Sequence, residues 1–516
     1  MNKNNTFISL LLILALAIFL RIFLLASIPG GFSCDEAANA YESYSIAETL
    51  RDRYGKFLPM FINPLKNDAK EALYFYLMIP FIKILGLNEF ATRLPSVLLG
   101  VLTVLTVYFL AKEMLNKKTG LIAALLLSIS PWHIHFNRIA FRLNLLPLLF
   151  CLGVLFFVKS FKQPKYLPLS SFVFALSLYT YNSARVFVPL FLLCLTTIFW
   201  KHLWQHKKET TLSLILFLFI FIPLLKFWIS PEGMVRARGT GIENNSFVIL
   251  KNYFSHFNPN FLFFNGKSVI TENPSQMGEL YLFEIITVPL GILKLLRDNV
   301  KTKMILLPWL LLYPIPAIFV GSESPQRSII GVSLFAIISA IGIAYLIDNW
   351  SYKRQTIALA TGLIVMSNVT FFSYKYFVNY PPEAAKLWNY GLKEAIDFSK
   401  KSSYGGFVLS SDTNSGCYAI HDFISQIPFY TQYSPQKYQQ SPIPPWVRDS
   451  KDKVYSLGNY HLMSISKQDI LITEYLYILR PEEIVTLESK GYNWKEIYTV
   501  IDSQGIEYFK LVEISI

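Results

Sequence analysis

The sequence predicts a mainly α-helical protein that crosses a membrane many times and carries a small soluble α/β domain at its C-terminal end. Hydrophobic residues make up 53% of the 516 residues and charged residues only 16%, a balance that soluble domains seldom have. The apolar residues gather in long runs with few charges, and this pattern stops after Phe372. We therefore expect a membrane domain over residues 1–372 and a soluble domain over residues 373–516. Within the soluble domain the sequence predicts an amphipathic helix from Pro382 to Lys400 and short strands at residues 406–411 and 470–473. It also predicts a hairpin of residues 498–501 and 506–512 around a Ser-Gln-Gly turn.

About eleven apolar runs are candidate membrane helices. They lie at residues 6–28, 94–111, 120–136, 143–158, 166–181, 186–200, 211–229, 280–296, 304–320, 328–347 and 355–372. Several are shorter than the roughly 20 residues that a bilayer needs, so these helices must extend into their loops. The first run is too long for a cleaved signal sequence and has no clear small-residue cleavage site, so we interpret it as the first membrane helix.

Lysine clusters indicate the orientation of these helices. One further apolar run, residues 72–87, contains Pro80 and Lys83. If this run lies in the interface and does not span, all the clusters fall on the cytoplasmic side, as the positive-inside tendency requires. The clusters are at residues 112–118, 159–165, 201–208, 294–303 and 353–354. We therefore expect residues 29–93 to form one large external segment with membrane-parallel helices, and the C-terminal domain to be external.

Two adjacent carboxylates, Asp35 and Glu36, follow the first membrane helix. Charges at a membrane surface are often functional, although this pair could simply cap a helix that begins at Ala37. The short external loops also contain isolated arginines, which could be explained by side chains reaching the interface. These are Arg138, Arg142, Arg185 and Arg327. Because all of them fall on the side of the carboxylates, a shared anionic ligand is the better explanation.

This layout suits the transfer of a group from a lipid-phosphate donor. A carboxylate can take the proton of an incoming hydroxyl, and cationic side chains can stabilise the charge that grows on a departing phosphate. Nucleotide sugars are cytoplasmic, so an external enzyme would use a donor held in the membrane. The net charge of +13 comes from lysines between apolar segments, which favours a bilayer and not a nucleic acid as the partner.

Other polar residues allow two interpretations. Arg21 lies within the first helix and could neutralise Asp35 or Glu36, or contact the donor. His133 and His135 flank Ile134 beside Trp132, but without matching acids or cysteines they favour hydrogen bonding over metal binding. Tyr181 fits an aromatic belt or a stacking contact with a sugar. Cys34 and Cys417 are both expected outside, where a disulfide could join them, but their spacing does not demand one.

Several motifs in the first 190 residues occur together. They are Asp35-Glu36 after the first helix, residues 53–59 (RYGKFLP), Lys70 ahead of residues 73–76 (LYFY), residues 88–96 (NEFATRLPS), residues 130–133 (SPWH) and residues 179–185 (YTYNSAR). In combination they resemble the GT-C glycosyltransferases, in particular the bacterial relatives of protein O-mannosyltransferases and of lipid A aminoarabinose transferases (families 39 and 83). The chain departs from common family patterns in having Glu71-Ala72 after Lys70, and Arg142 where an acid is common.

The resemblance implies a GT-C fold and an inverting transfer of a sugar from a polyprenyl-phosphate donor. The acceptor would be a hydroxyl of a lipid, glycan or protein on the non-cytoplasmic face of a bacterial or archaeal plasma membrane. Asp35 would act as general base or orient the acceptor, Glu36 would support it, and Lys70 would lie near the donor phosphate. The other candidates for donor contacts are Arg138, Arg142, Arg185, Arg327, Arg21 and Tyr181.

The resemblance allows a divalent cation, but no cluster of acids in the sequence supports a metal site. The chief alternative function is a transporter or flippase for lipid-linked sugars. Carriers tend to hold acids in mid-membrane and to have repeated halves, and this sequence shows neither. A non-catalytic membrane assembly subunit is a second alternative.

Overall fold

The computed structural model describes residues 3–65, 69–234, 242–274, 276–297, 300–349, 354–413, 417, 419–443 and 453–515. The chain forms two compact units. The first comprises Met1–Phe23 and Arg93–Tyr380, and the second comprises Leu24–Thr92 and Pro381–Ile516. The sequence suggested one division at residue 372, whereas the second unit groups the expected first external segment with the C-terminal domain. Each unit is described by itself below.

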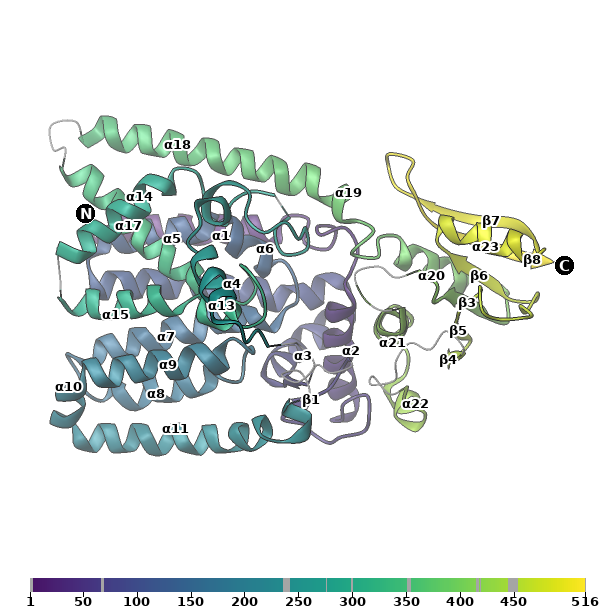
Figure 1. The fold of residues 1–516 in the computed structure, drawn as a ribbon, viewed down its shortest axis with the longest axis horizontal. Helices are drawn as coiled ribbons and strands as arrows, with labels where there is room; N and C mark the ends of the chain where they lie inside the picture. The colour runs from purple at the N-terminus through teal and green to yellow at the C-terminus, as the bar shows by residue number, and fades with distance from the viewer. Residues whose placement is uncertain are drawn as a thin grey trace. The chain divides into compact units, whose positions relative to one another are not determined.

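Every regular element described in the first unit is a helix (Figure 1). These helices are α1 (Lys3–Ile22), α4 (Glu89–Met114, whose first residues belong to the second unit), α5 (Lys117–Ile129), α6 (Pro131–Asn137), α7 (Leu145–Ser160), α8 (Tyr166–Ser177), α9 (Ala184–Ile198), α10 (Trp200–Gln205), α11 (Lys207–Trp228), α13 (Ser246–Ser255), α14 (Glu284–Arg297), α15 (Val300–Leu312), α16 (Ile315–Ile318), α17 (Gly331–Asn349) and α18 (Arg354–Tyr374). Short η1 (Arg142–Asn144), η2 (Asn260–Phe264) and η4 (Lys375–Asn379) helices complete the unit.

Six helical segments of the described chain are long and apolar enough to cross a membrane. They are Asn4–Ile22, Glu89–Met114, Arg142–Ser160, Lys207–Trp228, Gly331–Asn349 and Gln355–Ala384, and α5 with α6 makes a seventh if this pair, bent by 58°, is one span. The protein is therefore an integral membrane protein. The expected count of about eleven spans stays a prediction, because helices such as α8, with 12 residues, are shorter than a bilayer requires.

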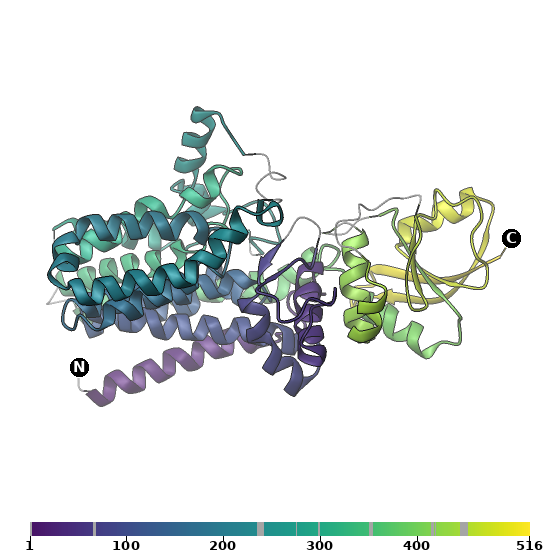
Figure 2. The ribbon, with the colours of Figure 1, turned by 90° about the horizontal axis from the view of Figure 1, so that it is seen from below.

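Glycines set the closest helix packing in the first unit. A Cβ atom at Gly291 of α14 would lie 2.0 Å from the carbonyl oxygen of Ile338, and one at Gly342 of α17 would lie 1.9 Å from that of Thr287. Without side chains at these positions the two backbones meet directly, as is common between membrane helices. Thr287 and Ser339 also share a buried hydrogen bond of 2.6 Å. Figure 2 shows the same bundle turned by 90°.

The N-terminal part of the second unit consists of α2 (Cys34–Thr49), β1 (Phe61–Ile62), β2 (Lys70–Glu71) and α3 (Leu73–Leu85). Helix α3 has 13 residues and is about 20 Å long at 1.5 Å per residue, which is less than the ~30 Å of a hydrocarbon core. The interpretation that residues 72–87 do not span stays a prediction, because α8, which is expected to span, is similarly short. The short strands pair antiparallel, with Ile62 opposite Lys70, so the pairing fixes the position of Lys70.

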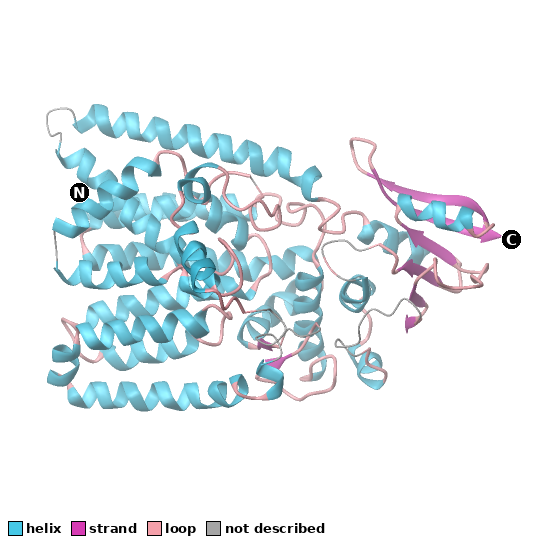
Figure 3. Ribbon diagram, in the orientation of Figure 1, coloured by secondary structure: helices cyan, strands magenta, loops and turns pink. Residues whose placement is uncertain are grey.

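The C-terminal part of the second unit is a six-stranded mixed sheet with the order β4-β5-β3-β6-β8-β7, drawn in magenta in Figure 3. The three central strands, β5, β3 and β6, are parallel, and the outer pairs are antiparallel. The strands are β3 (Phe407–Ser410), β4 (Tyr455–Leu457), β5 (Tyr460–Met463), β6 (Leu476–Leu479), β7 (Asn493–Ile501) and β8 (Glu507–Ser515). The helices are α19 (Tyr380–Ala384, of which Tyr380 ends the first unit), α20 (Leu392–Lys401), α21 (Ala419–Thr431), α22 (Pro435–Gln440), η5 (Pro481–Glu483) and α23 (Ile484–Ser489).

The sequence located part of this domain correctly. The strand expected at 406–411 and the hairpin expected around a Ser-Gln-Gly turn are confirmed as β3 and as β7 with β8. The strand expected at 470–473 is wrong, because these residues form no strand and β6 begins at Leu476. The single amphipathic helix expected from Pro382 to Lys400 is also wrong. Asn389 and Gly391 have positive φ angles of 52° and 83°, which separate α19 from α20.

Candidate functional site

Asp35 lies in the first turn of α2, next to a capped helix end. The side chain of Ser33 accepts a hydrogen bond from the backbone N–H of Glu36 (3.2 Å), and the Glu36 carboxylate accepts one from the backbone N–H of Ser33 (3.4 Å). This reciprocal capping box satisfies two N–H groups that the helix leaves open. Glu36 is fully buried, whereas the Asp35 side chain is 42% exposed. The two neighbouring acids therefore differ: Glu36 caps the helix and Asp35 faces outward.

Lys70 holds the Asp35 carboxylate. Its Nζ lies 2.8 Å from Asp35 Oδ1 and 3.3 Å from Asn39 Oδ1. Asn39 lies one helical turn after Asp35, so both side chains reach the lysine from one face of α2. The Lys70 side chain is only 6% exposed. A buried cation thus anchors a partly exposed carboxylate, which leaves the carboxylate oxygens within reach of an incoming hydroxyl.

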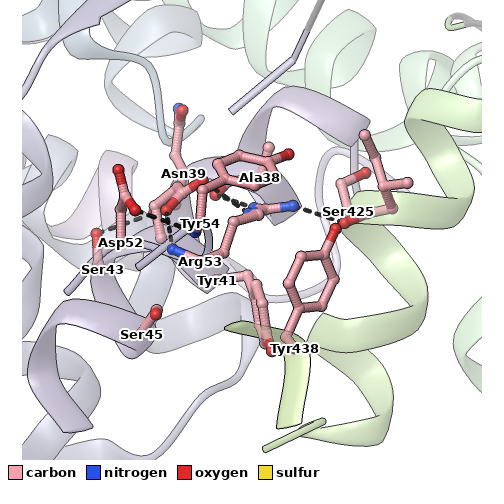
Figure 4. A network of polar contacts seen from close by, with 12 residues as sticks. Ala38, Asn39, Tyr41, Ser43, Ser45, Asp52, Arg53, Tyr54, Ser425 and Tyr438 are labelled. Carbon is pink, nitrogen blue, oxygen red and sulfur yellow. Dashed lines mark hydrogen bonds and ion pairs between the residues drawn. The ribbon is translucent and has the colours of Figure 1, made fainter. Parts of the chain in front are cut away.

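A second ion pair lies deeper on the same helix. Arg53 Nε is 2.7 Å from Glu42 Oε1, and neither side chain is exposed. The two terminal nitrogens of Arg53 donate to the carbonyl oxygens of Ile424 (2.6 Å) and Ala38 (3.0 Å). Figure 4 shows Arg53 between these segments of the chain. Burial raises the pKa of the Glu42 carboxyl, and the adjacent guanidinium opposes this shift.

Aromatic rings surround the Arg53 guanidinium. Its carbon lies 5.0 Å from the centre of the Tyr41 ring and 5.7 Å from that of Tyr438, distances at which cation–π attraction is significant. The Tyr41 hydroxyl donates to the carbonyl oxygen of Tyr433 (2.9 Å). Through Tyr433, Tyr438 and Ile424 this network joins α2 to α21 and α22. Arg53 therefore fixes the helix that carries Asp35 against the C-terminal domain.

A disulfide between Cys34 and Cys417 makes the same connection covalently. Cys34 is the first residue of α2 and immediately precedes Asp35. The bridge spans 383 residues of sequence, and the sequence alone had left this pairing open. The two sulfur atoms and a carboxylate oxygen of Asp422 all lie within 4.8 Å of one another. Because a metal is bound by thiolates, the bridged sulfurs do not make this cluster a thiolate metal site.

The first unit holds the remaining candidates, and Arg21 is the most fully bonded of them. Its guanidinium donates to Asn137 Oδ1 (3.0 Å), to His133 Nδ1 (2.9 Å) and to three carbonyl oxygens. These carbonyls belong to Ala17 (3.1 Å), Ser128 (2.9 Å) and Leu127 (3.3 Å). An arginine has five N–H donors, so all of them bond to protein atoms of the first unit. Arg21 in this arrangement ties α1 to α5 and α6.

Arg138 adjoins Arg21. Its Nη1 donates to the carbonyl oxygens of Leu20 (3.1 Å) and Arg21 (3.0 Å). The guanidinium also lies over the rings of Tyr376 (5.6 Å) and Phe377 (5.1 Å). Arg138 is fully buried, so it contributes to the packing of α1 against the segment after α18.

Arg142 and Tyr181, both predicted as donor contacts, lie together. The Arg142 guanidinium carbon is 5.4 Å from the centre of the Tyr181 ring, and Nη2 donates to Asn182 Oδ1 (3.1 Å). Arg185 lies over the Trp228 ring at 5.3 Å and is partly exposed. Arg327 is also partly exposed, and its backbone N–H donates to Ser324 Oγ (3.3 Å).

In the second unit, Asp35, Glu36 and Lys70 thus lie together. In the first unit, Arg138 donates to the backbone carbonyl of Arg21, and Arg142 lies over the Tyr181 ring. Sequence reasoning missed three positions. Asn39 had a usable signal, because it lies four residues after Asp35 on one helix. Arg53 stood in a motif without an assigned role, and Glu42 had no signal of its own.

Residues 70–227 match the family model described as dolichyl-phosphate-mannose-protein mannosyltransferase. No curated protein matches the chain in sequence.

Solved structures match the chain over more of its length. ArnT from Cupriavidus metallidurans in the apo state is 12% identical with a TM-score of 0.58, and the match covers 98% of this chain and 97% of ArnT. The structure of ArnT bound to undecaprenyl phosphate gives the same values. The apo oligosaccharyltransferase from Archaeoglobus fulgidus is 13% identical with a TM-score of 0.54, over 83% of this chain and 64% of that chain. The predicted resemblance is thereby confirmed, and the chain has the fold of the GT-C superfamily of membrane glycosyltransferases.

Proposed function

We propose that this protein transfers a sugar from a polyprenyl-phosphate donor to an acceptor hydroxyl, with Asp35 as the catalytic base. The observation that carries the proposal is the Asp35–Lys70 pair, in which a buried lysine fixes a carboxylate that is 42% exposed. The similar proteins support the donor class. ArnT has been solved with undecaprenyl phosphate, and the Archaeoglobus fulgidus oligosaccharyltransferase with dolichol-phosphate and an inhibitory peptide.

The proposed step is a single displacement. The acceptor oxygen attacks the anomeric carbon while Asp35 takes the hydroxyl proton. The bond between that carbon and the phosphate oxygen breaks, and the lipid phosphate leaves with the bonding electrons. The configuration at the anomeric carbon is inverted. Lys70 positions Asp35 and supplies positive charge for the phosphate. Glu36 supports Asp35 indirectly by capping α2.

The other candidates for donor contacts belong to the first unit. We propose Arg142, Arg185 and Arg327 for the phosphate or sugar, with Tyr181 beside Arg142 as a stacking surface. Arg21 and Arg138 have the hydrogen bonds described above, which favours a role in positioning α1. A divalent cation has no ligand set among these residues, and a chelator is the direct test of whether one takes part.

We also propose that the second unit faces the outside of a plasma membrane. Disulfides persist in oxidising compartments outside the cytoplasm, and the Cys34–Cys417 bridge lies in this unit. The lysine clusters between the apolar runs independently favour the cytoplasm for the opposite loops. An external second unit would expose Asp35 to acceptors outside the cell.

The test is a transfer assay with the purified protein and a panel of synthetic polyprenyl-phosphate sugars, each with and without a chelator. Acceptors are a hydroxylated peptide, a glycan and a glycolipid. We expect a glycosylated acceptor and free polyprenyl phosphate in equal amounts from at least one donor. Movement of a donor across vesicle membranes without any transfer would instead support the alternative, a flippase.

A further inference from the structure

The sheet domain contains a small polar cavity that the proposed transfer step does not use. It has a volume of about 50 Å³ and opens to the surface. Its polar lining comes from Asn389, Ser410, Thr413, Asp422, Arg480 and Glu483. The remaining wall is apolar and includes the Phe509 ring. Because about 10–15 Å³ of such a volume is enough for one water molecule, the space suits a few polar groups of a larger ligand.

The cavity lies where ligands commonly bind in sheets with parallel strands. Ser410 is the last residue of β3 and Arg480 directly follows β6, and these two strands are parallel neighbours. After β3 the chain enters α21, whose Ala419 lines the cavity, and after β6 it enters η5 and α23.

These two connections lie on opposite faces of the sheet. Val408 and Tyr477 pack with Ile484 and Leu487 of α23 in one hydrophobic cluster. The alternate strand residues Leu409 and Ile478 face the cavity, because successive strand residues point to opposite faces. The cavity is therefore at a topological switch point, the usual binding position in such sheets.

Arg480 is the central polar group of the cavity. It is 9% exposed, and its guanidinium carbon lies 4.3 Å from the centre of the Phe509 ring. Its side chain donates one hydrogen bond among the described residues, to Asn389 Oδ1 (2.6 Å). An arginine has five N–H donors, and burying a charged group without partners is costly. The guanidinium therefore has donors for a ligand.

Two carboxylates balance this cation. Glu483 accepts hydrogen bonds from the backbone N–H of Arg480 (2.7 Å) and from the Thr413 hydroxyl (2.7 Å). Asp422 also interacts electrostatically with Arg480. Two acids would repel an anionic ligand, and the buried arginine would repel a cation. A neutral group that both donates and accepts hydrogen bonds matches the cavity, and hydroxyl groups of a sugar have this property.

We propose that this cavity binds hydroxyl groups at the edge of an acceptor glycan. The inference deepens the proposed function, and it rests on that function for the identification of the glycan as the acceptor. Every lining residue belongs to the second unit, and the cavity is too small to hold a polyprenyl chain, so the lipid-linked donor is not the ligand. Bound hydroxyls would accept from Arg480 and donate to Asp422 or Glu483.

The cavity is coupled to the catalytic helix by the chain itself. Thr413 and Ala419 lie on either side of Cys417, and Asp422 lies within 4.8 Å of both sulfurs of the Cys34–Cys417 bridge. Cys34 immediately precedes Asp35. A glycan bound in the cavity would therefore contact residues close in sequence to Cys417, which is bridged to the first residue of α2.

Binding is tested without donor lipid, using the purified full-length protein in nanodiscs and saturation-transfer NMR. The probes are methyl glycosides of mannose, galactose and N-acetylglucosamine, together with inorganic phosphate and Mg²⁺ as charged comparisons. The variants are Arg480→Gln, which removes the donors, and Ala419→Val, which fills the cavity and leaves the polar groups intact. Lys495→Gln, an exposed change on β7, is the matched control.

We expect at least one glycoside to bind, and both cavity variants to weaken its binding tenfold or more, with no change for Lys495→Gln. If Arg480→Gln fails to fold, Ala419→Val decides alone. Binding that survives Ala419→Val, binding of phosphate or Mg²⁺ only, or no binding at all would each overturn the inference. Transfer in the separate assay without glycoside binding would remove only this cavity site, and glycoside binding without transfer would remove only the proposed function.

Discussion

Helix α2 carries two ion pairs with opposite character. Asp35 and Lys70 form a pair in which the carboxylate is 42% exposed and the lysine 6%. Arg53 and Glu42 form a second pair, and neither side chain is exposed. Glu42 lies one to two turns after Asp35 on α2, and Arg53 lies in the loop that follows this helix. The first pair has a solvent-facing side, whereas carbonyl oxygens and aromatic rings enclose the second.

The difference in exposure separates a pair that can take part in a reaction from a pair that stabilises the fold. A guanidinium with no exposure to solvent cannot approach a substrate, but its loss leaves a buried charge without a partner. A half-exposed carboxylate adds little to stability, because water screens it, and it remains available to a reactant. Changes to the first pair should therefore affect the rate of transfer, and changes to the second should affect folding.

The largest expected effect is that of Asp35→Asn. This change keeps the size of the side chain and removes the base, so we expect sugar transfer to fall by about 10³-fold, within the range for general-base catalysis. Thermal unfolding of the purified variant should stay close to that of the wild type. Glu36→Gln is the matched control, because glutamine also completes a capping box. Equal losses in both variants would contradict the separate roles given to the two acids.

Arg53→Met should act on folding. It leaves the Glu42 carboxylate buried without its partner, which typically costs about 3–5 kcal/mol of stability. Denaturant titration of the full-length protein in detergent measures the change. The double variant Arg53→Met with Glu42→Leu removes both charges and should recover much of the loss. A stable single variant would show that the buried pair does not hold α2 in place.

Removing the bridge with Cys34→Ala and Cys417→Ala should lower the free energy of unfolding by about 2–4 kcal/mol, because the cross-link restricts the unfolded chain. We expect transfer to persist at temperatures where the variant remains folded. Wild-type protein treated with a reductant should lose the same stability. If the variants and the reduced wild type unfold like the oxidised wild type, the bridge does not form in solution.

Lys70→Met should reduce transfer by about 10²-fold, a loss typical of a misplaced catalytic group. Its effect on unfolding should be smaller than that of Arg53→Met, and this contrast distinguishes the two pairs on α2. Steady-state kinetics and denaturant titration on the same preparation give both values. A large stability loss without a rate change would reverse the assignment.

The smallest effect is expected for Lys386→Met. Lys386 and Glu482 lie 2.7 Å apart, but their side chains are 62% and 44% exposed. Exposed pairs contribute about 0–1 kcal/mol, so unfolding should change by less than this amount. Denaturant titration checks the value, and a loss comparable with that of Arg53→Met would invalidate exposure as the property that separates the pairs.

Much of this molecule could be predicted from the sequence, where the signal is local. Apolar runs predicted a membrane protein, and the Ser-Gln-Gly turn between residues 498–501 and 506–512 predicted the hairpin of β7 and β8. The acid pair after the first helix predicted Asp35 and its motif predicted Lys70, which the structure places 2.8 Å apart.

Contacts between distant residues had no such signal. Nothing near Cys34 indicates that it pairs with Cys417, or that Arg53 bonds to the carbonyl of Ile424, because both depend on how two remote segments fold together. The arginines show the same limit. From the sequence, Arg21 is expected to neutralise Asp35 or Glu36 or to contact the donor. In the structure it donates to neutral acceptors on α1, α5 and α6, and only the packing of those helices brings these acceptors together.

The order in which the second unit becomes complete follows from its two-part construction. Residues 24–92 are synthesised well before residues 381–516. Until Cys417 and Ile424 have been synthesised, Arg53 lacks the carbonyl of Ile424 and Cys34 lacks its partner thiol. The early segment must wait through the insertion of the intervening membrane helices, so a prematurely terminated chain could contain every residue of the catalytic pair and still have no finished active unit.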